Sequence, residues 1–222
     1  MIDVVVYTSP NHIELQKTRL GECRPDDVIV KTIYTMVSSG TELRVLSGCA
    51  NKPEDYPCIP GYVVIGKIVE LGTNVKGWRT GDMVSCRNPE PVPDMKQIYG
   101  GQASYHRYST LSDIRPIALP GDARPLDYVC AEVASISLRG ITLANVSPDE
   151  SAIVIGQGLI GALSAAWLVR SGCRVVTVDR VDERLKRSRK LGVAATVAAS
   201  DPDAVFPFPF RQPARHGRGR LQ

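Results

Sequence analysis

A glycine-rich turn after an apolar run is the feature that most constrains the fold of this 222-residue chain. Residues 151–155 read Ser-Ala-Ile-Val-Ile, a run typical of a strand buried on both faces of a parallel sheet. Gly156, Gly158 and Gly161 follow at once in the spacing G-x-G-x-x-G, and residues 162–170 have a helical composition. This order predicts a strand, a tight turn and a helix of an α/β domain.

The pattern continues after this first unit. Residues 174–178 are a second apolar run that ends at Asp179, and residues 182–191 predict a charged helix. Residues 194–199 are a possible third strand. The stretch 146–200 therefore predicts β-α-β-α-β, which is the first half of a doubly wound parallel sheet.

The glycine positions suit the binding of a dinucleotide. Gly156 permits the tight turn, Gly158 lets the backbone approach a pyrophosphate, and Gly161 lets the helix pack closely on the strand. The free N–H groups of the first helical turn, at Leu159 and Ile160, face the phosphates at the positive end of the helix dipole. The alternative is a β-α-β unit with incidental glycines.

Asp179 indicates which dinucleotide is preferred. It stands 18 residues after Gly161, close to the spacing of about 20 at which an acidic side chain binds the adenosine ribose. A carboxylate there repels a 2′-phosphate, so we expect NAD rather than NADP. Arg180 follows directly, and because an arginine at this place can accommodate that phosphate, NADP stays open as the second cofactor.

Residues 1–145 have a different pattern, which predicts a β-rich domain. Short β-branched runs alternate with turns rich in proline and glycine, at residues 4–7, 27–33, 63–71 and 82–86. Strands at this spacing indicate a barrel or a sandwich. Residues 126–146 lack such turns and predict a helix that leads out of the domain.

Composition and charge exclude several classes of function. The net charge of +4 equals the four arginines of residues 204–222, which contain no acid, so the preceding chain is neutral and nucleic-acid binding is not indicated. No run approaches the roughly 20 apolar residues that span a membrane, and the first residues predict a strand, not a signal peptide. The six cysteines form no C-x-x-C pair. We expect a cytoplasmic protein with reduced, mostly buried cysteines.

Residues 201–222 are rich in proline, arginine and glycine and show no periodicity. Such a composition cannot pack a core, so this stretch predicts a disordered tail. Because the predicted sheet before it is unfinished, we favour the interpretation of a shifted reading frame or a truncation over that of an ordinary tail.

Several motifs in the correct order between residues 4 and 199 resemble the medium-chain dehydrogenase/reductase superfamily, the zinc-type alcohol dehydrogenases. Residues 38–43 are similar to its C-G-T-D-L segment, residues 60–72 to G-H-E-x-x-G-x-V-x-x-x-G, and residues 100–105 to G-G-x-A-E-Y. The resemblance implies a GroES-like barrel followed by a Rossmann domain, and NAD(P)-dependent hydride transfer. The resemblance also implies a small-molecule substrate and a homo-oligomer, although we expect that the half that forms the family's dimer is missing here.

The positions that match the family's zinc ligands hold other residues. Ser39 stands in place of the cysteine, and Tyr62 and Val63 stand in place of the histidine and the glutamate. Only Glu132 survives from the matching positions, and one carboxylate does not hold zinc. His106 lies in a strand-like run and is interpreted as a structural histidine. We therefore expect no metal site.

Without zinc, another group must polarise the substrate oxygen. The resemblance makes Thr41 the proton-relay hydroxyl and the first candidate. Tyr62 is a candidate donor to a carbonyl, unless it is a residue of the barrel rim. Glu132 is a candidate general base or a structural partner, and Ser39 is a candidate site residue or a filler of the space of the lost cysteine.

The serine before G-T-E and the P-G-Y in place of G-H-E resemble the bacteriochlorophyllide hydroxyethyl dehydrogenase group. That resemblance implies oxidation of a secondary alcohol with NAD. The quinone and enoyl reductases are an alternative metal-free branch, against which Asp179 argues, and a non-catalytic GroES-like remnant is the alternative of another class. We expect the chain as given to be inactive.

Overall fold

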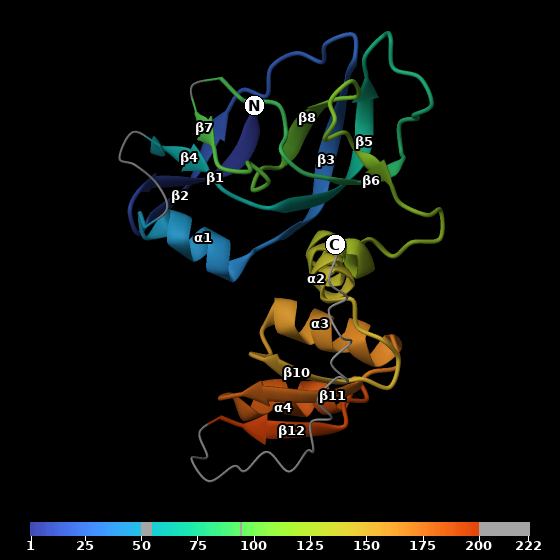
Figure 1. The fold of residues 1–222 in the computed structure, drawn as a ribbon. Coiled ribbons are helices and arrows are strands. Elements are labelled where there is room, and N and C mark those ends of the chain that lie inside the picture. Colours follow the sequence, from blue (N-terminus) through green and yellow to red (C-terminus); the bar gives the residue numbers. More distant parts are fainter. Residues whose placement is uncertain (50–54, 94, 200–222) are drawn as a thin grey trace, which may run out of the picture. The chain divides into compact units, whose positions relative to one another are not determined.

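A computed structural model describes residues 1–49, 55–93 and 95–199. The chain divides into two compact units, of which the first is Met1–Ala131 and the second begins at Glu132 (Figure 1). The sequence-based boundary lay at residue 145, so the helix before that boundary belongs to the second unit. The predicted tail at residues 201–222 lies outside the described residues.

The first unit contains two sheets and a helix. Its elements are β1 (Ile2–Ser9), β2 (His12–Thr18), β3 (Asp27–Met36), α1 (Ser39–Leu46), β4 (Cys58–Ile59), β5 (Val63–Leu71), β6 (Met83–Cys86), β7 (Lys96–Gln97), β8 (Tyr105–Ser109), β9 (Ile117–Ala118) and the 3-10 turn η2 (Pro125–Tyr128). One sheet has the order β2-β1-β4-β7 and the other has the order β8-β3-β5-β6-β9. The four strands predicted from the sequence are therefore confirmed as β1, β3, β5 and β6.

The sheet around β3 and β5 holds the main core of this unit. Its members are fully or almost fully buried and are chiefly β-branched, namely Val28, Val30, Val64, Ile68, Val84, Cys86 and Tyr108. β3 and β5 pair antiparallel from Val28 opposite Leu71 to Met36 opposite Val63. This register places the residue after β3 beside the residue before β5, and both candidate catalytic segments begin at this end of the sheet.

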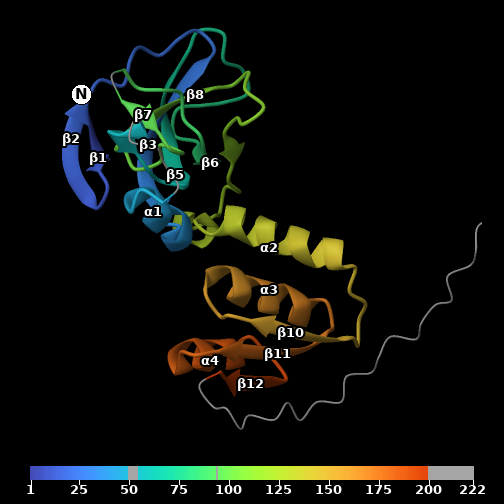
Figure 2. The same ribbon diagram turned by 60° about the vertical axis from the view of Figure 1, so that its left-hand side comes forward.

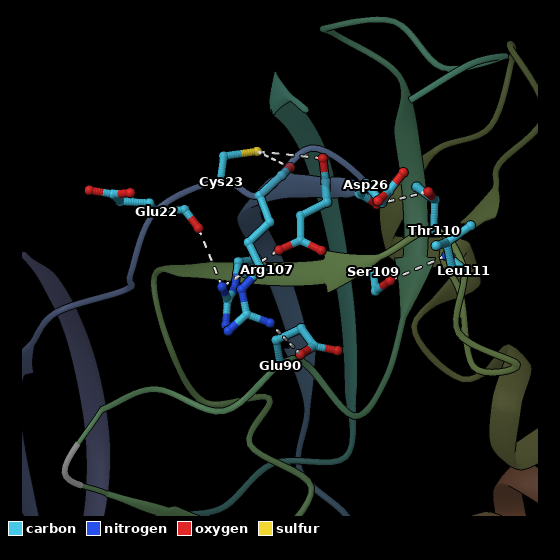
Figure 3. Close-up of polar contacts among 10 residues, drawn as sticks. Glu22, Cys23, Asp26, Glu90, Arg107, Ser109, Thr110 and Leu111 are labelled. Carbon is cyan, nitrogen blue, oxygen red and sulfur yellow. Dashed lines mark hydrogen bonds and ion pairs between the residues drawn. The ribbon is translucent and has the colours of Figure 1, made fainter. Parts of the chain in front are cut away.

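A buried ion pair joins β8 to β3 at the other end of the sheet (Figure 3). An Nη1 atom of Arg107 lies 3.5 Å from Oδ2 of Asp27, and both side chains are at least nine-tenths buried. The same nitrogen donates to the carbonyl of Glu22 at 3.3 Å, while the N–H of Glu90 donates to the carbonyl of Arg107 at 2.8 Å. Arg107 therefore links β8 to β3, to the loop that precedes β3 and to the segment around Glu90.

The second unit is an α/β arrangement with a parallel sheet (Figure 2). Its elements are α2 (Ala131–Ala144), β10 (Ser151–Ile155), α3 (Leu159–Arg170), β11 (Arg174–Asp179), α4 (Asp182–Arg189) and β12 (Ala195–Ala198). The described strands have the order β10-β11-β12, and both pairs are parallel. The predicted β-α-β-α-β order is confirmed.

One expectation about this sheet is wrong for the described residues. The apolar run of β10 predicted a strand buried on both faces, yet Ser151 is exposed and Ile155 is 82% exposed. β11 is the buried strand, with five of its six residues buried. The reason is position: β11 has a neighbour on each side, whereas β10 pairs with β11 alone within the described sheet.

The helical segment predicted at residues 126–146 consists of two elements. The turn η2 comes first, with Pro125 at its start, and α2 begins at Ala131. α2 packs in the second unit, where Nε1 of Trp167 donates to the carbonyl of Ala134 at 3.1 Å. The hydroxyl of Ser137 also donates to the carbonyl of Ile160, at 3.4 Å, so α2 contacts the first turn of α3.

In the described part of the chain, no helix has the length and apolar character that crossing a membrane requires. All six cysteines are free. Cys58, Cys86 and Cys173 are buried, and Cys49 is exposed. The expectation of reduced cysteines is consistent with these positions, and the expectation of burial holds for half of them.

Candidate cofactor and catalytic sites

The glycine-rich turn links β10 to α3 in the geometry that the sequence predicted. Gly156 has φ of +86° and donates its N–H to the carbonyl of Val178 at 2.7 Å. A Cβ on Gly161 would lie 1.8 Å from the carbonyl oxygen of Gly156, so only glycine fits there. A Cβ on Gly158 would meet no atom within 4 Å, so this residue borders open space. The turn is therefore closely packed at Gly161 and borders open space at Gly158.

The first turn of α3 supplies unpaired N–H groups. Gly158 is the N-cap residue of the helix, and its carbonyl accepts the N–H of Ala162 at 2.9 Å. The first N–H groups of a helix have no carbonyl partner within it, which applies here to Leu159, Ile160 and Gly161. The side chains of Leu159 and Ile160 are 43% and 48% exposed. The arrangement suits a phosphate, because donors and the positive end of the dipole coincide.

Asp179 stands at the carboxyl end of β11, beside the glycine-rich turn. Its Oδ2 accepts the N–H of Gln157, and its Oδ1 accepts the N–H of Val181 at 2.8 Å. These bonds, with that from Gln157 foremost, lower the pKa of the carboxyl group below its ordinary value. A guanidinium nitrogen of Arg184 also lies 3.7 Å from Oδ2. These contacts favour the ionised carboxylate and hold it beside the glycine-rich turn.

Two arginines lie near this carboxylate. Arg180 follows Asp179 directly and is exposed. Arg184, one turn further along in α4, is half exposed and pairs with Asp179. Arg184 was not a candidate in the sequence analysis. The sequence shows that Arg184 is five residues from Asp179. It does not show that α4 begins after a short loop and so places the Arg184 side chain beside the carboxylate.

Three of the candidate catalytic residues share the first unit. Ser39 and Thr41 lie in the first turn of α1, directly after β3, and Ser39 is exposed. The hydroxyl of Ser38 donates to the hydroxyl of Thr41 at 3.2 Å. Tyr62 precedes β5, and the pairing of Met36 with Val63 brings its segment beside the start of α1.

The ring of Tyr62 is half-buried and packs against Tyr99. The two ring centroids are 5.3 Å apart and the planes meet at 66°, an edge-to-face pair. Gly61 has φ of +107°, and a Cβ there would lie 2.5 Å from the backbone nitrogen of Gln102. Close contact between the segments before Tyr62 and after Tyr99 therefore positions both rings.

The fourth candidate, Glu132, is the second residue of α2 and belongs to the second unit. It is half-buried and lies in the first turn of the helix, where a carboxylate favours the helix dipole. Its catalytic role stays a prediction.

Sequence reasoning missed Glu42, which is buried in α1 with 5% of its surface exposed. Its Oε1 accepts the N–H of Ser38 at 3.0 Å, and its carboxylate also accepts hydrogen bonds from Gln102 and Tyr7. Burial raises the pKa of Glu42, and burial together with Glu42 raises the pKa of Tyr7 to about 12. A polar residue next to Thr41 was visible in the sequence, but its burial was not.

Gln102 links Glu42 to the Tyr62 segment. Its N–H donates to the carbonyl of Pro60 at 2.9 Å, and its side-chain oxygen accepts the hydroxyl of Thr35 at 2.9 Å. With the oxygen occupied by Thr35, its amide nitrogen is the group that faces Glu42. This buried network joins the Thr41 and Tyr62 segments.

The residues at the zinc positions do not fit zinc. Val63 is buried and offers no lone pair, and hydroxyls at Ser39 and Tyr62 are poor substitutes for cysteine and histidine. Within the described ranges, no three side chains among His, Cys, Asp and Glu gather in a way that could hold a metal. His106 is buried in β8, and burial lowers its pKa to about 4, as suits a structural histidine.

Comparison with known proteins agrees with this geometry. Residues 24–120 match the family described as the alcohol dehydrogenase GroES-like domain. Alcohol dehydrogenase 2 of Caenorhabditis elegans is 26% identical over 214 residues, which cover 87% of this chain and 60% of that protein. The 2-desacetyl-2-hydroxyethyl bacteriochlorophyllide A dehydrogenase of Cereibacter sphaeroides is 28% identical over 178 residues, which cover 76% and 53%.

Solved structures share the fold. Galactitol-1-phosphate dehydrogenase of Escherichia coli matches with a TM-score of 0.74 and 23% identity, covering 89% of this chain and 61% of that one. A short chain alcohol dehydrogenase of Escherichia coli CFT073, in complex with NADH, matches with a TM-score of 0.76 and 18% identity, covering 90% and 63%. The chain spans 53% to 63% of the length of these four proteins.

The alcohol dehydrogenase GroES-like domain model covers residues 24–120, and over most of its length the chain is similar to medium-chain dehydrogenases/reductases. Its first unit is the GroES-like domain, and its second unit holds a partial Rossmann-like sheet.

Proposed function

We propose that this chain carries the GroES-like domain and the adenosine side of the cofactor site of an NAD-dependent oxidoreductase. The observation that carries the proposal is the carboxylate of Asp179, which accepts the backbone N–H groups of Gln157 and Val181 beside the glycine-rich turn. The N–H groups at Leu159, Ile160 and Gly161 hold the pyrophosphate, and Asp179 accepts hydrogen bonds from the ribose hydroxyls. Arg180 and Arg184 are positive groups beside the same ribose, so NADP is the second cofactor of this proposal.

The proposed reaction is hydride transfer between the nicotinamide and a secondary alcohol or ketone, without catalytic zinc. Bound NAD supplies the hydride chemistry, and the protein supplies position and a route for the proton. In the oxidation, the hydride goes to bound NAD, and Thr41 Oγ1, which is hydrogen-bonded to Ser38, takes up the proton of the substrate hydroxyl while it releases its own proton to solvent. Tyr62 Oη donates a hydrogen bond to the substrate oxygen. We propose Glu132 as a general base and Ser39 as a polar residue of the site.

The similarity to the bacteriochlorophyllide A dehydrogenase of Cereibacter sphaeroides supports this reaction class. The quinone and enoyl reductases are the competing branch, and the position of Asp179 favours the NAD-dependent dehydrogenases over them. A non-catalytic role of the GroES-like domain is a further candidate, because the described parallel sheet has only the three strands β10, β11 and β12.

A binding titration tests the proposed cofactor site. Purified 222-residue protein is added to NADH while the nicotinamide fluorescence is recorded, and ADP-ribose is titrated by calorimetry. We expect both ligands to bind, since the adenosine side is present in the described residues. Failure of ADP-ribose to bind a chain that is folded by circular dichroism would contradict the proposal.

A further inference from the structure

The middle residue of the glycine-rich turn carries a buried amide. Gln157 lies between Gly156 and Gly158 and has only 4% of its surface exposed. Its Nε2 donates to the carbonyl of Gly156 at 3.1 Å and to the carbonyl of Val154 at 3.3 Å. Its backbone N–H is the donor to Asp179. One residue therefore holds the end of β10, the turn and the end of β11.

The oxygen of this amide has a partner from a distant part of the chain. The hydroxyl of Ser188 in α4 donates to Oε1 of Gln157 at 2.7 Å, across 31 residues of sequence. Ser188 is 1% exposed, so water does not compete for either group. Because the two carbonyls require a donor, the amide nitrogen faces them and its oxygen is left to the hydroxyl.

The hydrogen bond from Ser188 to Gln157 is unusual for a serine inside a helix. A helical serine commonly donates to a carbonyl of its own preceding turn, as Ser137 does to Val133 in α2. Ser188 instead shares the buried face of α4 with Leu185 and reaches the turn between β10 and α3. The position of α4 is thereby connected to the loop that borders the pyrophosphate.

We propose that Ser188 is a positioning residue of the dinucleotide site: its hydroxyl fixes the Gln157 amide, which holds the glycine-rich turn in the conformation that receives a pyrophosphate. The inference rests on the proposed function, because it assigns a purpose to the same site. Without the hydroxyl, Oε1 of Gln157 is buried without a donor, and the amide turns or the loop opens towards water.

The expected effect depends on which part of the ligand is present. ADP-ribose contains the pyrophosphate, whereas adenosine reaches only the ribose-binding end at Asp179. Ser188→Ala is expected to weaken ADP-ribose binding about tenfold, the order of a lost buried hydrogen bond, and to leave adenosine binding within about twofold. A general loosening of the unit would weaken both ligands alike.

The experiment measures both dissociation constants on the 222-residue chain, by calorimetry for ADP-ribose and by NMR titration for adenosine. Gln157→Leu removes the other side of the bond, and the double variant with Ser188→Ala is expected to bind no more weakly than Gln157→Leu alone. Thr177→Val is the matched control: it deletes a buried hydroxyl of β11 that has no hydrogen-bond partner in the described part of the chain, and it is expected to change neither constant.

The outcomes separate this inference from the proposed function. Selective loss of ADP-ribose binding in both single variants, with a non-additive double variant, supports it. If the unaltered chain binds ADP-ribose and Ser188→Ala binds it equally well, or loses both ligands equally, the positioning role is overturned while the cofactor site stands. If the unaltered, folded chain binds neither ligand, both proposals are overturned.

Discussion

Asp179 is the single side chain on which the cofactor preference depends. Its carboxylate accepts hydrogen bonds from the backbone N–H groups of Gln157, Val181 and Arg180, which favours the charged form. A charged carboxylate excludes a 2′-phosphate, yet Arg184 at 3.7 Å offsets part of that charge. We therefore expect the protein to prefer NAD(H) over NADP(H), and we expect a single substitution at Asp179 to reduce this preference.

Replacing Asp179 by serine is expected to narrow the preference for NAD(H) over NADP(H) by about tenfold, because the repulsion of the 2′-phosphate is removed. The measurement is the ratio of the two dissociation constants from fluorescence titration. Asp182→Ser, which removes an exposed carboxylate of α4, is the matched control and is expected to leave the ratio unchanged. Equal affinities of the unaltered protein for both cofactors would contradict the prediction.

Glu42 predicts a pH dependence of stability. Burial raises its pKa, so between the unfolded and the folded pKa the native state binds more protons than the unfolded state. The free energy of unfolding therefore falls as the pH rises through this window, and the penalty is fully present above the folded pKa. The slope contributed by one such group is at most about 1.4 kcal/mol per pH unit.

Glu42→Gln cannot ionise and is expected to lose this contribution. The measurement is urea unfolding of both proteins at a series of pH values from mildly acidic to neutral, and the difference between the two curves reports Glu42. Glu70→Gln, at an exposed position of β5 in the same unit, serves as control. The curve is the free energy of unfolding of the unaltered protein minus that of Glu42→Gln, and it is expected to fall as the pH rises. A flat or rising curve would show that the pKa of Glu42 is not raised in the folded state.

At the scale of elements, the ion pair between β3 and β8 tests how the barrel is held together. Asp27 and Arg107 are paired and almost fully buried, so removal of one partner leaves an uncompensated charge. Arg107→Met is expected to lower the free energy of unfolding of the first unit by about 3 to 5 kcal/mol. The double variant with Asp27→Asn is expected to recover much of this loss, because the unpaired charge is gone.

Thermal and urea unfolding measure both variants. The matched control is Arg124→Met, which breaks the exposed pair with Asp127 in the same unit and is expected to change stability little. A similar small effect for Arg107→Met would mean that water reaches the Asp27 carboxylate and that the pair contributes little to the sheet.

At the scale of the whole molecule, the residues that match the family's zinc ligands predict the metal content. Ser39, Tyr62 and Val63 cannot provide the ligands of a catalytic zinc, so we expect far less than one zinc per chain. Elemental analysis measures the zinc per chain in protein that is purified and dialysed without a chelator, with the dialysis buffer as the blank. A stoichiometric zinc that survives dialysis would point to cysteine or histidine ligands at other positions.

The second whole-molecule prediction concerns turnover. A dinucleotide lies across the switch point between two halves of a Rossmann sheet, and the described strands β10, β11 and β12 provide one half. We therefore expect the 222-residue chain to bind the adenosine portion of the cofactor. We expect no oxidation or reduction of a substrate above background. Absorbance of the reduced nicotinamide at about 340 nm is followed with secondary alcohols, ketones, quinones and enones. Robust turnover with any of them would refute this account.

Features that depend on neighbouring residues could be predicted from the amino-acid sequence. The turn at Gly156, the start of α3 and the place of Asp179 at the end of β11 follow from local spacing, because backbone conformation and strand length are local properties. For the same reason the strands β1, β3, β5 and β6 could be predicted from the sequence.

The burial of side chains and the contacts between distant segments depend on how the folded chain packs. The exposure of β10 depends on how many strands flank it, and the burial of Glu42 depends on Gln102, 60 residues further along the chain. Ser188 and Gln157 meet because α4 packs beside the turn. Such contacts join segments whose separation in sequence carries no distance information, so packing and strand register alone establish them.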